Sequence, residues 1–161
     1  MITIKNTVFL FLSFLFFTSA HSQKTEKNSR IKNLIESKNY VFKAQSVNPV
    51  RGSTRQLSSD YDLQLFNDSL VTYLPYFGRA YSAPINATDG GIKLNTTHFN
   101  YTIQKKKRGG WELYFTPTES LDISSLHLSV SASGYASLQV QSTNRDPISF
   151  NGYVTDLKKN K

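Results

Sequence analysis

The chain has 161 residues, with 19 lysines and arginines against 11 acidic residues, a formal net charge of +8 and no cysteine. The absence of cysteine excludes disulfide scaffolds, thiolate metal sites, thiol nucleophiles and lipid anchoring through a cysteine. With 39% hydrophobic and 13% aromatic residues, the composition indicates a folded domain rather than a disordered chain.

Residues 1–22 have the three parts of a secretory signal peptide. Lys5 precedes an unbroken apolar core at residues 8–17, and small residues follow it. That core is too short for a membrane-spanning helix, which needs about 20 apolar residues. We expect cleavage after Ala20 or Ser22, and an exported protein, periplasmic or secreted, without a transmembrane span after cleavage. The alternative is an uncleaved membrane anchor.

Residues 23–39 form a polar, basic segment with a short helical pattern. Ile31, Leu34 and Ile35 have the spacing of one helix face, and Ser29 is a possible N-cap for a helix that runs to about Ser37. The apolar stripe is narrow, so we expect this helix to lie on another element rather than form a core.

From Tyr40 onward, apolar and polar residues alternate with a period of two, which is typical of antiparallel sheet with one buried face. Asn67-Asp68, Gly109-Gly110 and Ser133-Gly134 separate neighbouring runs and suit tight hairpin turns. We predict a single, mainly β domain over residues 40–156, followed by a basic tail at 157–161. Its eight or nine strands form an antiparallel meander that closes into a barrel or packs as a two-layer sandwich. The clearest runs are 40–44, 61–66, 70–73, 99–107, 111–116, 126–132, 136–141 and 148–154.

Residues 73–84 combine four aromatic residues, one arginine and two prolines in a connection between strands. Aromatic faces and a guanidinium together suit a flat ligand or an anion. The alternative is that the aromatic rings close one end of the barrel, with Arg79 stacked on a ring or paired with Asp60 or Asp62. The candidate ligand-binding residues are Tyr73, Tyr76, Phe77, Arg79 and Tyr81.

The same segment carries a resemblance to a known family. Residues 73–81, together with Gly90-Gly91-Ile92, residues 131–138 and Asn144-Arg145, resemble the bacterial exported family of domains of unknown function numbered 4251. The resemblance spans residues 35–154. It implies an envelope or secreted protein with a mostly antiparallel, lipocalin-like β fold and no assigned activity. Related exported proteins are often lipoproteins, but this chain lacks the cysteine that such anchoring requires.

A second candidate surface is a run of four positive charges, which directly precedes Gly109-Gly110 and so is expected at a hairpin tip. A tip of this kind suits acidic lipid headgroups or an anionic polysaccharide. The alternative is a solvated turn that resists aggregation. We do not expect nucleic acid as a partner, because an exported protein seldom meets it. The four residues are Lys105, Lys106, Lys107 and Arg108.

No pattern in the chain predicts an enzyme, a metal site or a cofactor. His98 and His127 are far apart and have no metal-ligand spacing. Ser29-Arg30-Ile31-Lys32 matches a Ser-x-x-Lys motif whose partner motifs are missing. The carboxylates at Asp60, Asp62, Glu112, Glu119 and Asp122 have no spacing that selects a catalytic pair.

Two functional hypotheses follow from the sequence, beside a third in which the scattered carboxylates converge into an unconventional hydrolase site. The first is a non-catalytic binding module for a small apolar or aromatic ligand, in a pocket closed by residues 73–81 with Arg79 as the polar anchor. The alternative is a cell-envelope interaction protein that docks on anionic surfaces through the basic hairpin. An interior filled by Leu128, Val130, Leu138 and Phe150 would argue against an internal pocket.

Overall fold

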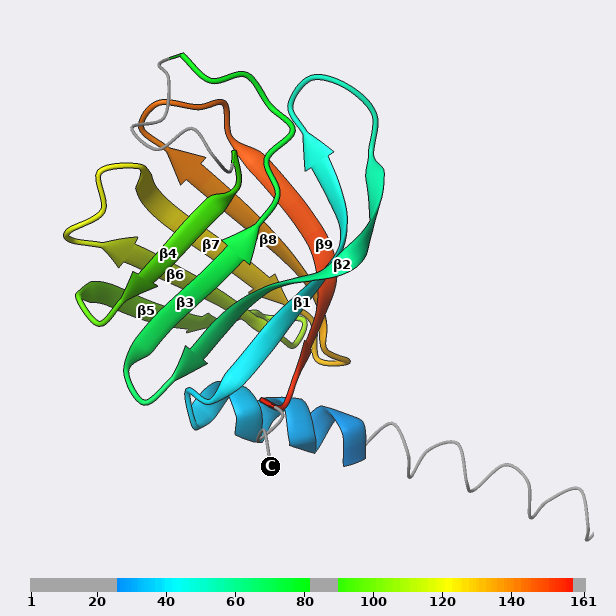
Figure 1. Cartoon of the computed structure of the whole chain (residues 1–161). Helices are drawn as coiled ribbons and strands as arrows, with labels where there is room; N and C mark the ends of the chain where they lie inside the picture. The colour runs from blue at the N-terminus through cyan, green and yellow to red at the C-terminus, as the bar shows by residue number, and fades with distance from the viewer. Residues whose placement is uncertain (1–25, 82–89, 158–161) are drawn as a thin grey trace, which may run out of the picture.

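The computed structural model describes residues 26–81 and 90–157. One helix, at residues 26–36, precedes nine strands (Figure 1). The predicted signal peptide lies outside the described residues, as does the basic tail after Leu157. No helix in the part of the chain that is described has the length and apolar character needed to cross a membrane.

The nine strands form one continuous antiparallel sheet in the order β4-β3-β2-β1-β9-β8-β7-β6-β5. Consecutive strands are neighbours except for β4 and β5, which lie at opposite edges of the sheet, and β1 also pairs with the last strand, β9. The strands are β1 Tyr40–Pro49, β2 Arg55–Phe66, β3 Ser69–Leu74, β4 Ile92–Thr96, β5 Phe99–Lys105, β6 Trp111–Pro117, β7 Ile123–Val130, β8 Tyr135–Ser142 and β9 Ile148–Thr155.

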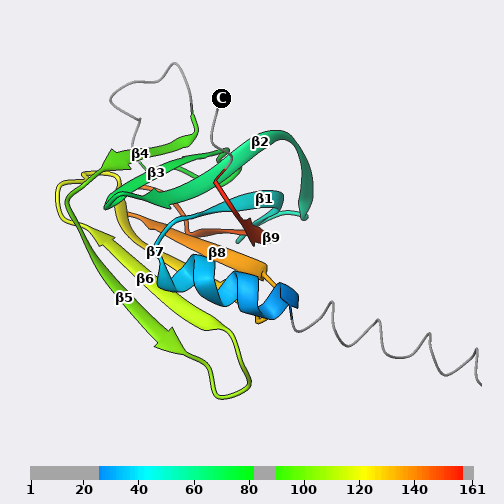
Figure 2. The same ribbon diagram turned by 90° about the horizontal axis from the view of Figure 1, so that it is seen from below.

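The sheet curls into a nearly closed barrel. Only Thr97 and His98 separate β4 from β5, so the two edges of the sheet meet at that corner and then diverge (Figure 2). The prediction of a mainly β, antiparallel barrel of eight or nine strands with one N-terminal helix is therefore confirmed. The alternative of a two-layer sandwich is wrong, because the pairing of β1 with β9 joins the two halves into one sheet.

The N-terminal helix lies across one end of the barrel (Figures 1 and 2). Its apolar stripe enters the core, where Ile31 and Ile35 are 4% and 1% exposed. The described part of the helix covers residues 26–36, so Ser29 lies within the helix, and the prediction of Ser29 as the N-cap is wrong. Lys38, with a φ of 53°, ends the helical segment in the left-handed region before β1 begins at Tyr40.

The predicted turn residues adopt the backbone that tight hairpins require. Asn67 and Asp68 both have positive φ, at 46° and 58°, between β2 and β3. Gly109 and Gly110 have φ of 86° and 97° at the β5–β6 turn, and Gly134 has 88° at the β7–β8 turn. At Asn67-Asp68, positive φ at both central residues matches the twist of the flanking strands. Gly109 and Gly134 instead take the left-handed position that ends a turn, where their amides donate to the carbonyls of Lys106 and Ser131.

The barrel interior is filled by the inward-facing apolar residues of the strands. Leu128, Val130, Leu138 and Phe150 are all fully buried in one core cluster, which also receives Ile31 and Ile35 from the helix. β4 is the strand that the clear alternating runs did not include, because its five residues give only two inward apolar positions.

Candidate functional site

The aromatic segment of residues 73–81 divides between two parts of the surface. Tyr73 lies near the end of β3, where its ring is 5.5 Å from that of Tyr61 and the Lys93 ammonium lies 5.2 Å from its centroid. Leu74 is buried, and the chain then leaves the sheet with Tyr76 half-buried. Tyr73 therefore lies on the sheet beside Tyr61 and Lys93, not in the connection that carries the other candidate residues.

Tyr76 joins its segment to the β8–β9 connection. Its hydroxyl lies 2.8 Å from the carbonyl oxygen of Arg79 and 3.1 Å from that of Asp146. Burial and the nearby carboxylate of Asp146 raise the pKa of Tyr76, so the hydroxyl keeps its proton for these carbonyls. The guanidinium of Arg145 covers the ring, 5.1 Å from the centroid. Tyr76 therefore has a structural role.

The arginine contacts differ from those expected for Arg79. Arg145 stacks on Tyr76, and Arg55 lies 4.8 Å from the ring centroid of Phe77. Asp62 pairs instead with Lys43, at 2.8 Å. The side chain of Arg79 is exposed, while its backbone carbonyl accepts a hydrogen bond from the amide of Asp146. The expected pairing of Arg79 with Asp60 or Asp62 is therefore wrong.

Phe77 and Tyr81 face solvent rather than the barrel interior. Phe77 is 39% exposed and Tyr81 is 65% exposed. The Tyr81 hydroxyl donates to the carboxylate of Asp146, and this bond raises the pKa of Tyr81. The structure thus brings Tyr76, Phe77, Arg79 and Tyr81 together on the surface at the end of the barrel opposite the helix. We call this region, with the connections that carry Arg51, Asp122 and Arg145, the loop end.

Arg145 is the buried centre of the loop end, and the sequence patterns did not select it as a site residue. It is 9% exposed, lies 3.2 Å from the carboxylate of Asp122 and donates to the carbonyls of Gly90 and Gly91, at 2.9 and 3.4 Å. One guanidinium thus ties three connections together. The signal in the sequence was Asn144-Arg145, which the family resemblance included without a role.

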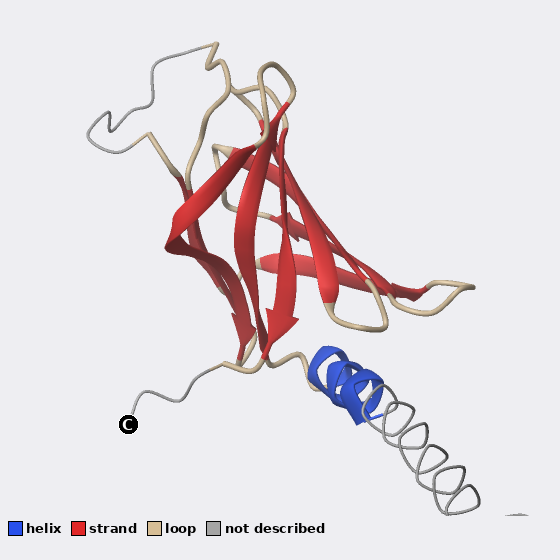
Figure 3. Ribbon diagram, turned by 90° about the vertical axis from the view of Figure 1, so that its right-hand side faces the viewer, coloured by secondary structure: helices blue, strands red, loops and turns tan. Residues whose placement is uncertain are grey.

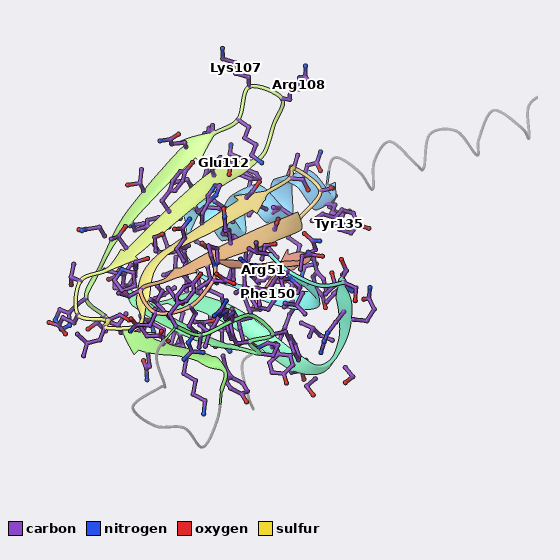
Figure 4. All side chains as sticks on the ribbon, turned by 90° about the horizontal axis from the view of Figure 1, so that it is seen from above. Arg51, Lys107, Arg108, Glu112, Tyr135 and Phe150 are labelled. Atoms are coloured by element: carbon purple, nitrogen blue, oxygen red, sulfur yellow. The ribbon has the colours of Figure 1, made fainter. Side chains whose placement is uncertain are left out.

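The predicted basic cluster lies at the β5–β6 hairpin, but its four charges are not equivalent. Lys105 pairs with Glu36 of the helix at 3.4 Å, and Lys106 pairs with Glu112 of β6 at 2.7 Å. Among the described residues, Lys107 and Arg108 form no ion pair. They extend from the hairpin tip away from the barrel (Figure 4). The tip therefore presents two uncompensated cations.

Lys106 belongs to a polar network on the outer face of β6 and β7. Its ammonium also donates to Ser129 at 2.6 Å, while Glu112 binds His127 at 2.6 Å, and the His127 ring stacks on Tyr114 with centroids 4.5 Å apart. Burial alone would raise the pKa of Glu112, but the hydrogen bonds from Lys106 and His127 outweigh it and lower that pKa.

This network does not have the arrangement of a nucleophilic site. The hydroxyl of Ser129 contacts an ammonium and the carboxylate of Glu112, at 3.3 Å, and that carboxylate is already engaged by Lys106 and His127. A nucleophile needs a free base within hydrogen-bond reach. Over residues 26–81 and 90–157, no three side chains of the metal-ligating types come together.

The helix and the β5–β6 hairpin lie side by side and flank an open groove of about 400 Å³. Figure 3 shows the hairpin projecting from the barrel on the side where the helix lies. The helix contributes Lys32 to the groove, the hairpin contributes Lys105 and Lys106, and Trp111 and Ala132 line its apolar part. We call this the helix–hairpin groove. The sequence patterns missed it, because its two sides are about 75 residues apart in the chain.

Two wider hollows lie on the outer face of the sheet, with volumes of about 610 and 780 Å³. The first crosses β8, β9 and β1, and its lining is mostly serine, glutamine and asparagine. The second follows β1 and β2 around the Lys43–Asp62 pair. Neither is lined by the aromatic segment of residues 73–81.

Comparison with solved structures supports the fold. A crystal structure of a DUF4251 family protein from Bacteroides eggerthii DSM 20697 superposes with a TM-score of 0.61 at 15% sequence identity. The match covers 81% of this chain and 87% of that chain. No curated protein matches this chain. The sequence profile of the domain of unknown function DUF4251 matches residues 22–154, which is most of the chain. The chain therefore belongs to the DUF4251 family.

Proposed function

We propose that this protein is an exported, non-enzymatic binding protein that docks on an anionic component of the cell envelope. The observation that carries the proposal is the meeting of cations from two elements: Lys32 of the helix and Lys105 and Lys106 of the hairpin line one groove, beside the hairpin tip that carries Lys107 and Arg108. Lys107 and Arg108 lie at the outermost point of this surface (Figure 4). Among the described residues, no acidic side chain pairs with them. We call Lys32 and residues 105–108 the cationic surface.

Electrostatics explains why this surface favours docking. The whole chain carries a net charge of +8, so its overall field attracts anionic surfaces, and the hairpin concentrates part of that charge where it reaches a surface first. Each lysine or arginine close to an anionic membrane contributes about 1 kcal/mol to binding. Such contacts are exposed and therefore weaken as salt is added.

The test is co-sedimentation with phosphatidylglycerol–phosphatidylcholine vesicles and with an anionic cell-wall polysaccharide. We expect binding at about 0.01 M salt, where the Debye length is about 30 Å, and loss at about 1 M, where it is about 3 Å. Lys107→Glu/Arg108→Glu should weaken binding by at least about tenfold, because each cation contributes about 1 kcal/mol.

The matched control is Arg51→Glu/Arg79→Glu. It makes the same change in net charge at the opposite end of the barrel, on two side chains that are exposed. Binding should survive in the control. Equal losses in the two variants, or binding that ignores salt, would reject docking through the hairpin.

A second function, binding of a small apolar or aromatic ligand at the loop end by Phe77, Arg79 and Tyr81, is favoured by the surroundings of the two rings. Arg55 stacks on the exposed ring of Phe77, and the charges of Arg51 and Arg79 act on Tyr81. Exposed rings beside guanidinium groups suit a flat ligand with an acidic group. Because apolar side chains fill the barrel interior, this site lies at the rim of the barrel and not inside it.

The aromatic sulfonate 1-anilinonaphthalene-8-sulfonate is a suitable probe for this second site. We expect saturable fluorescence enhancement that Phe77→Ala/Tyr81→Ala and Arg51→Glu/Arg79→Glu abolish and that Lys107→Glu/Arg108→Glu leaves intact. Enhancement that is unchanged in the first two variants would exclude the loop end as the binding site.

A further inference from the structure

The helix–hairpin groove combines an apolar lining with a cationic rim. Gly109, Gly110, Trp111 and Ala132 contribute apolar surface, whereas Lys32 and Lys105 place ammonium groups beside it. A volume of about 400 Å³ lies within the usual range for small-molecule sites, about 300–1,000 Å³. The groove therefore has the two chemistries that an amphiphilic anion requires.

Trp111 is the residue that distinguishes this groove from an ordinary basic surface. It is the single tryptophan of the chain, it is 6% exposed, and it begins β6 directly after the tip of the hairpin. Its indole Nε1 is buried and has no hydrogen-bond partner among the described residues. Tryptophan is favoured where an apolar environment meets a polar one, and a buried donor without a partner is unusual in a folded protein.

The rim has a cation available for a ligand. In the described chain Lys32 forms no ion pair, and Lys105 pairs with Glu36 only at 3.4 Å, with both side chains largely exposed. An exposed pair of this kind contributes little and exchanges readily with another anion. Lys106 is different, because Glu112 and Ser129 hold its ammonium at 2.7 and 2.6 Å. The anion would thus be held by Lys32 and Lys105.

We propose that the helix–hairpin groove receives an anionic phospholipid. Its phosphate binds between Lys32 and Lys105, and the adjoining glycerol and first acyl carbons pack on Trp111 and Ala132. This inference rests on the proposed docking function and specifies its partner. A free phosphate leaves the apolar lining unused, and a polysaccharide offers no acyl chain to cover it. Charge complementarity together with the apolar lining therefore favours a lipid.

Trp111 makes the proposal directly measurable. The purified protein is titrated with dihexanoylphosphatidylglycerol below its micelle concentration, while the emission of Trp111 is recorded. Parallel titrations use dihexanoylphosphatidylcholine, inorganic phosphate and dextran sulfate. We expect a saturable change in emission with the anionic lipid alone. An equal response to the zwitterionic lipid, or to dextran sulfate, would overturn the assignment of an anionic lipid.

Two variants locate the lipid in the groove. Ala132→Glu places a carboxylate on the β7–β8 turn that lines the groove, and Lys32→Glu reverses the charge on the exposed face of the helix. Each should weaken lipid binding by about tenfold or more, because a carboxylate in the groove repels the lipid phosphate. The matched control is Lys27→Glu on the same helix, which lies outside the groove lining.

The two proposals fail in different ways. If vesicle binding depends on salt and on Lys107 and Arg108, but Trp111 emission stays constant and Ala132→Glu binds normally, the groove assignment is wrong and docking stands. If vesicles do not bind at all, docking on lipid fails together with the groove. Circular dichroism of each variant verifies that it is folded, so a loss of binding is not a loss of structure.

Discussion

Arg145 is the residue whose contacts most clearly determine the shape of the loop end. Its guanidinium reaches Asp122, the carbonyls of Gly90 and Gly91, and the ring of Tyr76, and it is 9% exposed. Lysine has the same charge but not the planar fork that makes these contacts simultaneously. Of the candidate ligand residues, Arg145 contacts Tyr76, whose hydroxyl joins the segment to the carbonyl of Asp146.

We expect Arg145→Ala to lower the free energy of unfolding by about 2–4 kcal/mol, since removing one partner leaves buried polar groups and a carboxylate without a hydrogen bond. Arg145→Lys should recover only part of that loss. Urea denaturation followed by circular dichroism measures the effect. Arg79→Ala is the control, because its side chain is exposed and should change stability by no more than about 0.5 kcal/mol. Similar values for the two alanine variants would contradict the role of Arg145.

Glu112 gives a pH dependence of stability with a definite sign. Its pKa is lower in the folded protein than in the unfolded chain, because Lys106 and His127 bind the carboxylate. Its contribution is therefore fully present above the unfolded pKa and is lost as the pH falls through the folded pKa. The side chain is 25% exposed, so solvent screening keeps the contribution small.

We expect Glu112→Gln to cost about 1–2 kcal/mol near neutral pH, the usual worth of hydrogen bonds to a charged group after screening. The difference from the wild type should shrink as the pH falls below about 4. Urea midpoints measured from about pH 3 to about pH 7 test this. Glu119→Gln, which removes an exposed pair with His98, should show no such trend. A constant difference across that range would contradict a lowered pKa of Glu112 in the folded protein.

At the scale of the elements, β1 and β9 pair across a bulge. The register of β1 with β9 shifts between Ala44 and Ser46, and Gly152 lies opposite this irregularity. A Cβ at Gly152 would lie within van der Waals overlap of the backbone oxygen of Lys43. Backbone cannot move aside as a flexible side chain does, so glycine is required where the first and last strands pair.

Gly152→Ala should therefore destabilise the protein by more than about 4 kcal/mol or prevent folding, since the clash separates the two strands that join the halves of the sheet. Gly90→Ala is a matched control, because no atom lies within 4 Å of its added Cβ. The soluble yield and the melting temperature of the two variants test this prediction. A stable Gly152→Ala protein with unchanged melting would show that the two strands can separate without cost.

Element types were predictable because they depend on local periodicity. The alternation in β6 to β9 and the turn pairs Asn67-Asp68 and Gly109-Gly110 gave the correct hairpins. Errors occurred where the local signal was short. β4 has only five residues. The helix includes Glu26 to Asn28, which precede the predicted N-cap Ser29. Helix starts depend on capping contacts that a sequence pattern does not reveal.

The whole molecule is built around one core rather than two. A single sheet runs from β4 to β5, and the helix contributes Ile31 and Ile35 to the same cluster of buried residues. Disrupting either end of the barrel exposes that shared core. A single domain of this kind unfolds without a populated intermediate.

We expect urea unfolding followed by Trp111 fluorescence to coincide with that followed by far-ultraviolet circular dichroism. Trp111 reports the helix end of the barrel, whereas circular dichroism reports all the strands. Coincident midpoints and slopes indicate one cooperative unit. An earlier fluorescence transition would show that the helix and the β5–β6 hairpin separate from the rest, and adding Ile35→Ala would then move that transition alone.

Local sequence patterns were sufficient for the element types and the hairpin turns, because each of these depends on residues close together in the chain. Short sequence blocks were sufficient for the family. It also identified the basic hairpin and the aromatic segment as chemically distinctive. The three-dimensional fold was needed to show that Phe77 and Tyr81 are exposed at the loop end, that Arg145 rather than Arg79 stacks on Tyr76, and that Lys32 lies beside the hairpin at Trp111. These contacts join residues far apart in sequence. Their positions follow from how the sheet curls and from the pairing of β1 with β9.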